Sequence, residues 1–199
     1  MGEPKALLCS RSETLLERAV SVAMEASGRT PLISLPHPSR CDPALRRLAR
    51  RLAPRGVVHD AEPDCGPAAG VLAALTHPRW REEWREEWLL WIAVDMPRLD
   101  AATLRHFATH RPLAAMAAVA AYRSRVQPTC ALLHRSALPL ARRAAAQRRG
   151  LIWLLEAAAA AIVPLPRRDG GSPLLSIDTP ATWRTHRRSE SRPAPAARS

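Results

Sequence analysis

The sequence predicts an α/β domain with a mostly parallel sheet, on three observations. Stretches with helical periodicity alternate with short apolar runs, the pattern of strands joined by crossover helices. A chain of 199 residues with 47% hydrophobic residues is long enough to bury one full core. The apolar runs are all far shorter than the roughly 20 residues that span a bilayer. We therefore expect one domain over residues 1–186.

The first half of this domain is expected to alternate helix and strand from its start. The expected order is helix, strand, helix, strand, helix and strand, at residues 13–27, 31–35, 42–53, 57–60, 66–75 and 89–95. The first helix has apolar side chains at helical spacing and ends at Gly28. The second is basic and amphipathic, with Asp42 as its cap and Pro43 in the first turn, where a missing N–H costs nothing. The strand at 89–95 is apolar throughout, which indicates burial on both faces.

The second half continues the pattern. Two extended segments separated by a polar turn near Arg125, then two helices, a strand and a final segment are expected at residues 116–124, 128–135, 136–149, 151–160, 161–165 and 176–183. Residues 187–199 are rich in Ser, Pro, Ala and Arg without a hydrophobic pattern, so we expect a disordered basic tail.

Composition limits the function classes. The four cysteines lie far apart with no CxxC pair, and no histidine stands at metal-finger spacing, so neither a disulfide framework nor a structural zinc site is indicated. The charged N-terminus lacks the apolar core of a signal peptide, and we expect a cytoplasmic protein without a membrane partner. No GxSxG motif or Ser/His/Asp set supports a hydrolase.

The formal net charge is +12, yet Lys5 is the one lysine among the 30 basic residues. Arginine in an alanine-rich background is typical of a surface cation, whereas a compact ammonium is well suited to a phosphate. The lone lysine is therefore either a chance survival or a functional group. Nucleic acid is a less favoured partner, because the arginines are dispersed and glutamates flank the tryptophan repeat.

That repeat, WREEWREEW at residues 80–88, would place Trp80, Trp84, Trp88 and Trp91 on one stripe if the preceding helix continues. It is either a local extension of a surface helix, supported by pairs one turn apart, or a ridge of exposed indoles that docks a partner.

Two acids follow predicted strands. Asp95 ends the apolar run at 89–95, and Asp60 ends the strand before it and precedes GPAAG. Ligands gather at the carboxyl ends of strands in open α/β sheets, and a carboxylate there suits a hard cation such as Mg²⁺. The alternative is that each acid only caps the next turn or helix.

Six blocks, read in order, resemble the MobA-type molybdenum cofactor guanylyltransferases, which are Rossmann-like three-layer nucleotidyltransferases. They are MGEPKALL, LLER, HDAEPDCGPAAGVLAAL, LLWIAVDMPRL, QPTCALLHRS and SIDTPATW, at residues 1–8, 15–18, 59–75, 89–99, 127–136 and 176–183. Any one block is unremarkable, but the order over residues 1–183 is specific.

The resemblance implies roles for individual residues. Lys5 would grip the triphosphate, and Asp95 would bind Mg²⁺. The nucleotide would lie against a group in the third block, namely Asp60, Gly66, Pro67 and Gly70. The pterin substrate would face a further group, namely Gln127, Arg148, Ser176 and Asp178.

The implied reaction transfers GMP from GTP to molybdenum-loaded molybdopterin and releases pyrophosphate. Transfers of this kind depend on positioning and on neutralising charge, so a metal carboxylate and a phosphate-gripping ammonium are the parts required.

The sequence also departs from the family. It lacks the usual first strand and the LAGGxSxR loop, and Pro4 and Ser176 replace an Asp and an Asn of the family motifs. Either the protein extends upstream, or the chain is a degenerate relative that acts by binding alone, as an adaptor that delivers the cofactor to molybdoenzymes or their chaperones through the tryptophans.

Overall fold

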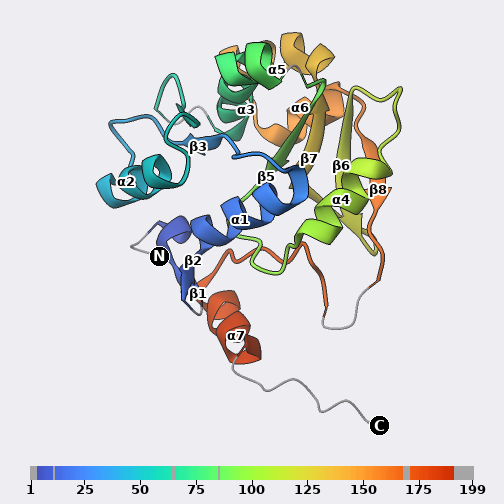
Figure 1. Cartoon of the computed structure of the whole chain (residues 1–199). Helices are drawn as coiled ribbons and strands as arrows, with labels where there is room; N and C mark the ends of the chain where they lie inside the picture. Colours follow the sequence, from blue (N-terminus) through green and yellow to red (C-terminus); the bar gives the residue numbers. More distant parts are fainter. Residues whose placement is uncertain (1–3, 11, 64–65, 85, 168–170, 191–199) are drawn as a thin grey trace.

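A four-stranded sheet lies at the centre of the structure, a computed structural model that describes residues 4–10, 12–63, 66–84, 86–167 and 171–190 (Figure 1). The elements in chain order, with 3₁₀ helices η1 and η3 and a π-helical segment η2, are η1 Lys5–Leu7, β1 Cys9–Ser10, β2 Glu13–Thr14, α1 Leu15–Ser27, β3 Ile33–Leu35, α2 Pro43–Leu52, β4 Val57–His59, α3 Pro67–Thr76, η2 Arg79–Trp84, β5 Trp88–Ile92, α4 Ala101–Thr109, β6 Ala117–Tyr122, β7 Arg125–His134, η3 Arg135–Ala137, α5 Leu138–Ala146, α6 Leu151–Ala157, β8 Ala161–Pro164 and α7 Pro180–Glu190. The expected α/β alternation is confirmed.

The central sheet has the strand order β5-β7-β6-β8. Strand β7 is antiparallel to both β5 and β6, while β6 and β8 are parallel, so β5, β6 and β8 all run in one direction. The expectation of a mostly parallel sheet thus holds for strand direction. It fails for the hydrogen-bonded pairs of this sheet, because a tight hairpin at Arg123 and Ser124 folds β7 back between β5 and β6.

Strands β3 and β4 form a separate parallel pair, joined from Ile33–Val57 to Leu35–His59. Around them, Ala6, the N-terminal half of α1 and helix α2 form a small hydrophobic cluster. Helix α2 begins as expected: the Asp42 carboxylate accepts hydrogen bonds from the backbone N–H groups of Ala44 and Leu45, and Pro43 stands in the first turn.

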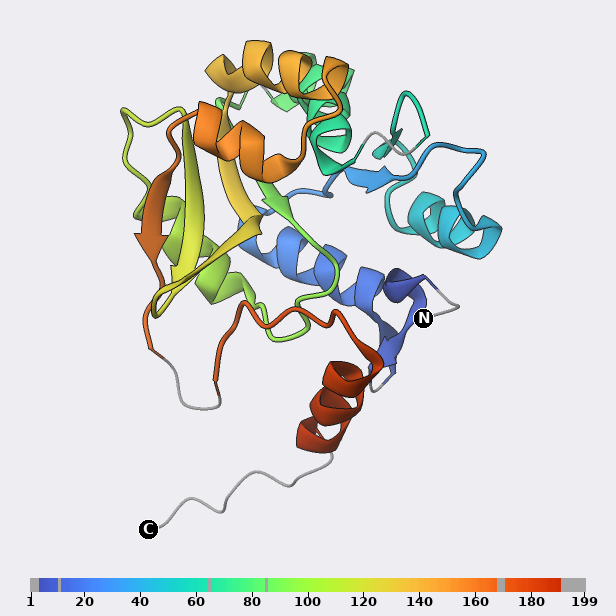
Figure 2. The same ribbon diagram turned by 180° about the vertical axis from the view of Figure 1, so that it is seen from behind.

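Helices cover both faces of the central sheet. On one face, Val119, Ala131 and Leu133 pack against α3, α5 and α6. On the other, Ala118 and Leu132 pack against α4 and α1. Alternate residues of each strand therefore enter two different clusters, and the two views show the resulting three layers (Figures 1 and 2).

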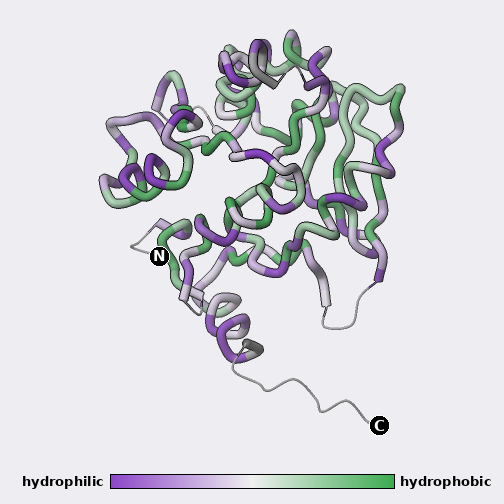
Figure 3. The backbone as a smooth tube through the Cα atoms, in the orientation of Figure 1, coloured by the Kyte–Doolittle hydropathy of each residue, from purple (hydrophilic) through white to green (hydrophobic). Residues whose placement is uncertain are grey.

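Hydropathy follows this layering. The strands of the central sheet are largely hydrophobic, whereas α2 and α7 carry strongly hydrophilic turns (Figure 3). None of the helices in the described ranges is long and apolar enough to cross a membrane.

The structure contradicts the proposed tryptophan ridge. Trp80 lies in η2 and is only 5% exposed, packed in the cluster with α3 and α5. Trp88 and Trp91 lie in strand β5, where they face opposite sides of the sheet. The side chain of Trp84 lies outside the described residues. The repeat therefore changes from helix to strand midway, because burial of Leu89 and pairing with β7 outweigh its helical spacing.

Some boundaries also differ. Strand β5 ends at Ile92, so Asp95 stands in the turn that follows the strand. Helix α7 continues through Glu190, so Arg187, expected to begin the tail, lies inside a helix. Residues 191–199 of the expected tail lie outside the described residues.

Gly70 is held in place by packing. A Cβ at this position would collide with Oγ of Ser34 in β3 and would stand 2.9 Å from Cη2 of Trp91 in β5. Close approach of α3 to these two strands accounts for this glycine, which the sequence placed against the nucleotide.

We predict that Gly70→Ala lowers the free energy of unfolding by about 1–3 kcal/mol, because the added methyl group overpacks the interface between α3, β3 and β5. Gly150→Ser is the matched control, since Gly150 caps α6 with nothing within 4 Å of an added Cβ. Urea denaturation should show a change of at most about 0.5 kcal/mol for the control. Equal effects of the two substitutions would contradict the packing role.

Candidate active site

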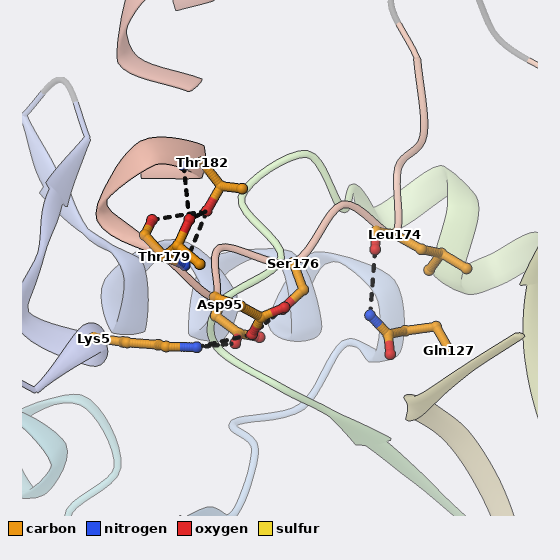
Figure 4. A network of polar contacts seen from close by, with 8 residues as sticks. Lys5, Asp95, Gln127, Leu174, Ser176, Thr179 and Thr182 are labelled. Atoms are coloured by element: carbon orange, nitrogen blue, oxygen red, sulfur yellow. Dashed lines mark hydrogen bonds and ion pairs between the residues drawn. The ribbon is translucent and has the colours of Figure 1, made fainter. Parts of the chain in front are cut away.

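The Lys5 ammonium group lies between two carboxylates that come from distant parts of the chain. Lys5 Nζ donates hydrogen bonds to Asp95 Oδ2 and to Asp178 Oδ1, each at 3.0 Å (Figure 4). The Asp95 side chain is 15% exposed and that of Asp178 is 69% exposed. The Asp95 side of the site is therefore largely buried, whereas the Asp178 side is exposed to solvent. The sequence predicted both Lys5 and Asp95 for one pocket, and the structure places them in contact.

Each of the three residues stands next to a buried neighbour that fixes its backbone. Ala6 follows Lys5 and packs in the small cluster with α1 and α2. Met96 follows Asp95 and is buried in the cluster under α4. Ile177 precedes Asp178 and is fully buried, and its backbone N–H donates to the Asp95 carbonyl oxygen at 2.9 Å. This backbone bond joins the two carboxylate-bearing loops directly.

Contacts in the site shift the pKa values of Lys5 and Asp178. Burial tends to lower the pKa of Lys5, but its hydrogen bonds to Asp178 and Asp95 and their negative charges outweigh that effect, so the pKa is raised overall. The hydrogen bond from Lys5 lowers the pKa of Asp178 against a smaller opposing effect of burial, and Ser176 adds to the lowering. Both shifts favour the charged forms of Lys5 and Asp178 at neutral pH.

Ser176 and Gln127, which the sequence assigned to the pterin, both bond to the chain segment that carries Asp178. Ser176 Oγ donates to Asp178 Oδ1 at 3.1 Å, and Gln127 Nε2 donates to the carbonyl oxygen of Leu174 at 3.3 Å (Figure 4). Gln127 stands where the register between β6 and β7 shifts, beside Pro128, which cannot donate to the ladder. The bulge thus accommodates the proline and places Gln127 against the loop that carries Asp178.

Asp60, Gly66 and Pro67 lie in the connection from β4 to α3. The backbone N–H of Asp60 donates to Leu35 O at 3.1 Å, which extends the pairing of β3 and β4. Burial raises the pKa of its carboxyl group, against the opposing charges of His59 and His37. Gly66 has φ 72°, a left-handed conformation that favours glycine, and Pro67 opens α3. Within the described ranges, no hydrogen bond or ion pair joins this connection to Lys5.

Arg148 does not lie with the residues expected around the pterin. It follows α5, and its guanidinium group forms an exposed ion pair with Glu62 at 3.3 Å. Glu62 belongs to the connection from β4 to α3, so Arg148 stands beside the predicted nucleotide segment. The arginine-rich sequence around it offered no unique register from which to place it.

Sequence reasoning missed a buried polar contact near the site. Ser10 Oγ and His186 Nε2 share a hydrogen bond at 3.4 Å, and both residues are 3% exposed. No local signal could have revealed this pair, because 176 positions separate its members.

We predict that Asp178→Asn lowers the pKa of Lys5, because the variant removes one of the two negative partners. The chain has one lysine, so ¹³C-lysine labelling gives a single ε-carbon signal to titrate. Asp42→Asn, at the α2 cap, is the control and should leave this pKa unchanged. An identical Lys5 pKa in wild type and Asp178→Asn would contradict the contact.

The pH dependence of stability has a definite sign. The Lys5 pKa is raised in the folded state, so its contribution is complete below 10.5 and is lost as the pH rises through the folded value. The Asp178 pKa is lowered, so its contribution is present above 3.8 and is lost as the pH falls through the folded value. Because the pair is exposed, Asp178→Asn should lower the free energy of unfolding by at most about 1 kcal/mol at neutral pH. Denaturation experiments should show that this difference from wild type vanishes at low pH.

Comparison with solved structures identifies proteins of similar fold. Molybdopterin-guanine dinucleotide biosynthesis protein A from Archaeoglobus fulgidus matches with a TM-score of 0.68 and 20% identity, over 96% of this chain and 92% of the other. Rv0371c from Mycobacterium tuberculosis H37Rv matches with a TM-score of 0.66 and 24% identity, over 94% and 91% of the two chains. At these identities the likeness shows the fold alone.

The fold also matches that of a synthase of lower sequence identity. The 4-diphosphocytidyl-2C-methyl-D-erythritol synthase from Anaerococcus prevotii DSM 20548 matches with a TM-score of 0.66 and 10% identity, over 92% of this chain and 88% of the other. A search of curated proteins finds no match by sequence.

The family model named MobA-like NTP transferase domain matches residues 1–165, which include Lys5, Asp60 and Asp95. The match covers well over half of the 199 residues and agrees with the fold and with the blocks seen in the sequence. The chain belongs to the MobA-like NTP transferase family.

Proposed function

We propose that this protein transfers GMP from GTP to molybdenum-loaded molybdopterin, as a Mg²⁺-dependent guanylyltransferase. Membership of the NTP transferase family supports nucleotidyl transfer as the reaction class. One observation carries the proposal furthest: the Lys5 ammonium group meets Asp95 and Asp178 at 3.0 Å in the loops beside the sheet edge. An amine that would bind phosphate thus lies beside carboxylates that would bind a metal ion.

The carboxylates fit a hard divalent cation. Oxygens of Asp95 and Asp178 already converge on one positive charge, that of Lys5. Among the residues described, no group of three or more His, Cys, Asp or Glu side chains could hold a metal. A Mg²⁺ ion held by the two aspartates would therefore take its remaining ligands from substrate phosphates and water, as Mg²⁺ commonly does. Asp95 would hold the ion, with Asp178 beside it, and the ion would supply charge neutralisation at the phosphates.

In the proposed reaction, an oxygen of the terminal phosphate of molybdopterin forms a bond to the α-phosphorus of GTP. The bond from that phosphorus to the oxygen bridging to the β-phosphate breaks, and pyrophosphate leaves with the electron pair. Lys5 uses two of its three N–H donors on Asp95 and Asp178, and it would direct the third to phosphate oxygens, where it would stabilise the negative charge that develops. The protein thus contributes positioning and electrostatics, the main requirements of phosphoryl chemistry.

Binding of the two substrates is assigned to two groups of residues. Asp60, Gly66 and Pro67, which follow β4, would contact the nucleotide. Gln127, which bonds to Leu174, and the loop Ser176–Asp178 would face the pterin. Similarity of the fold to molybdopterin-guanine dinucleotide biosynthesis protein A from Archaeoglobus fulgidus supports the choice of guanine nucleotide and pterin. The free thiols of Cys9, Cys41 and Cys130 agree with action in the reducing cytoplasm.

We predict that Lys5→Ala and Asp95→Asn each lower the rate of GMP transfer by about a hundredfold or more, since each removes a group that acts on the transferring phosphoryl group. The assay is pyrophosphate release from GTP with molybdenum-loaded molybdopterin and Mg²⁺, with CTP as the competing nucleotide. Calorimetric titration of GTP should show weaker binding in both variants and in wild type without Mg²⁺.

Arg142→Ala is the control for loss of a positive charge, because Arg142 is exposed on α5 away from these loops. It should leave transfer and binding unchanged. Equal GTP affinity in wild type, Lys5→Ala and Asp95→Asn would refute the proposed function, and a strong preference for CTP would refute the guanine assignment.

A further inference from the structure

Helix α7 protrudes from the body of the protein and lies beside the hairpin of β1 and β2 (Figures 1 and 2). Two side chains of the helix reach this hairpin. His186 shares the hydrogen bond with Ser10, and Arg187 Nη1 donates to the carbonyl oxygen of Cys9 at 3.0 Å. The C-terminal helix is thus bonded to the strand that follows Lys5.

The contact between Ser10 and His186 is enclosed. Both residues are 3% exposed, and the Trp183 ring stacks on the His186 ring with centroids 5.8 Å apart. The Arg187 guanidinium group lies over the Trp183 ring, 5.9 Å from the ring centroid. A buried hydroxyl and a buried imidazole cost free energy unless they are bonded, so this pair specifies one position of α7 on the hairpin.

The same two chain segments also carry the site. Helix α7 starts two residues after Asp178, and a reciprocal pair of bonds fixes that start: Thr179 Oγ1 accepts from Thr182 N, and Thr182 Oγ1 accepts from Thr179 N, both at 3.1 Å (Figure 4). Strand β1 starts two residues after η1, which carries Lys5. The N-terminal and C-terminal segments are therefore joined at two separate places, by the contact from Lys5 to Asp178 and by the contact from Ser10 to His186.

The Asp178 side chain depends on this arrangement. It is 69% exposed, and its described hydrogen bonds are those from Lys5 and Ser176. The buried Ile177 anchors the backbone before Asp178, whereas the backbone after Asp178 leads within two residues into α7. A shift of α7 along the hairpin would move the carboxylate relative to the ammonium.

We propose that His186 is a positioning residue for the reaction inferred above: its contact with Ser10 clasps α7 to the hairpin and thereby sets Asp178 against Lys5. The expected effect on GMP transfer rests on the proposed function. The contact between Ser10 and His186, called the clasp below, is present in the ligand-free protein, so it is measured separately.

The first measurement follows the ε-methylene NMR signal of Lys5, at constant pH and without metal or nucleotide, in the full chain labelled with ¹³C-lysine. Asp178→Asn defines the shift that loss of the contact produces. His186→Phe and Ser10→Ala should each reproduce at least half of that shift. His186→Gln, which retains a hydrogen-bonding group at the position of Nε2, should restore the wild-type signal.

Arg184→Ala is the control, because Arg184 is exposed on the same helix. It should leave the Lys5 signal unchanged. A thermal unfolding curve for each variant separates a released clasp from a failure to fold, and Ser10→Ala and His186→Gln keep the test valid if His186→Phe does not fold. An unchanged Lys5 signal in folded His186→Phe and Ser10→Ala would overturn the clasp.

The second measurement uses GMP transfer. His186→Phe should raise the KM for Mg²⁺-bound GTP about fivefold, the factor that corresponds to about 1 kcal/mol, with a smaller change in kcat, and His186→Gln should reverse the effect. A shifted Lys5 signal with an unchanged KM would overturn the positioning role. Absence of any GTP binding or transfer in wild type would instead refute the proposed function, while the Lys5 signal would still report on the clasp.

Discussion

One ammonium group between two carboxylates joins three parts of this chain that lie far apart in sequence. Lys5 comes from the first described turn, Asp95 from the loop after β5, and Asp178 from the segment that leads into α7. Asp95 is the sheltered partner, and a half-buried carboxylate without a counter-charge would cost free energy. Lys5 in the N-terminal turn supplies that counter-charge, and the backbone bond from Ile177 to the Asp95 carbonyl holds the C-terminal segment at the same loop.

The sheet explains why these segments can meet. Parallel strands deliver their following loops to one edge, and Asp95 stands in such a loop. The backbone bond from Ile177 to the Asp95 carbonyl brings the last loop to the same edge, although β8, the strand before it, lies at the opposite end of the strand order. The long connection from β8 therefore crosses the edge of the sheet, and Gln127 supports it on the way through its bond to Leu174.

Local signals in the sequence predicted much of this architecture. Asp42 and Pro43 marked the start of α2 correctly, and the apolar run before Asp95 marked β5. The contact between Lys5 and Asp95 was expected from the resemblance to the MobA-type family, which implies that one residue grips the triphosphate and the other binds its metal ion.

Other features depended on tertiary contacts that no local pattern contains. The spacing of Trp80, Trp84 and Trp88 fits a helix, but pairing with β7 placed Trp88 in a strand. The need for glycine at position 70 also includes its packing against Ser34 and Trp91, which come from two different strands. The bond between Ser10 and His186 is formed by surface-like residue types that only the docking of α7 buries.

The division of the core into separate clusters has a consequence for local unfolding. Lys5 is anchored through Ala6 in the small cluster of α1, α2, β3 and β4, whereas Asp95 borders the larger cluster under the central sheet. Small clusters with short strands open at lower free energy than long central strands, and amide hydrogen exchange would detect such opening first in β3 and β4. Each opening of that part would carry the lysine away from its carboxylates, so the persistence of the site is limited by the weaker of the two regions.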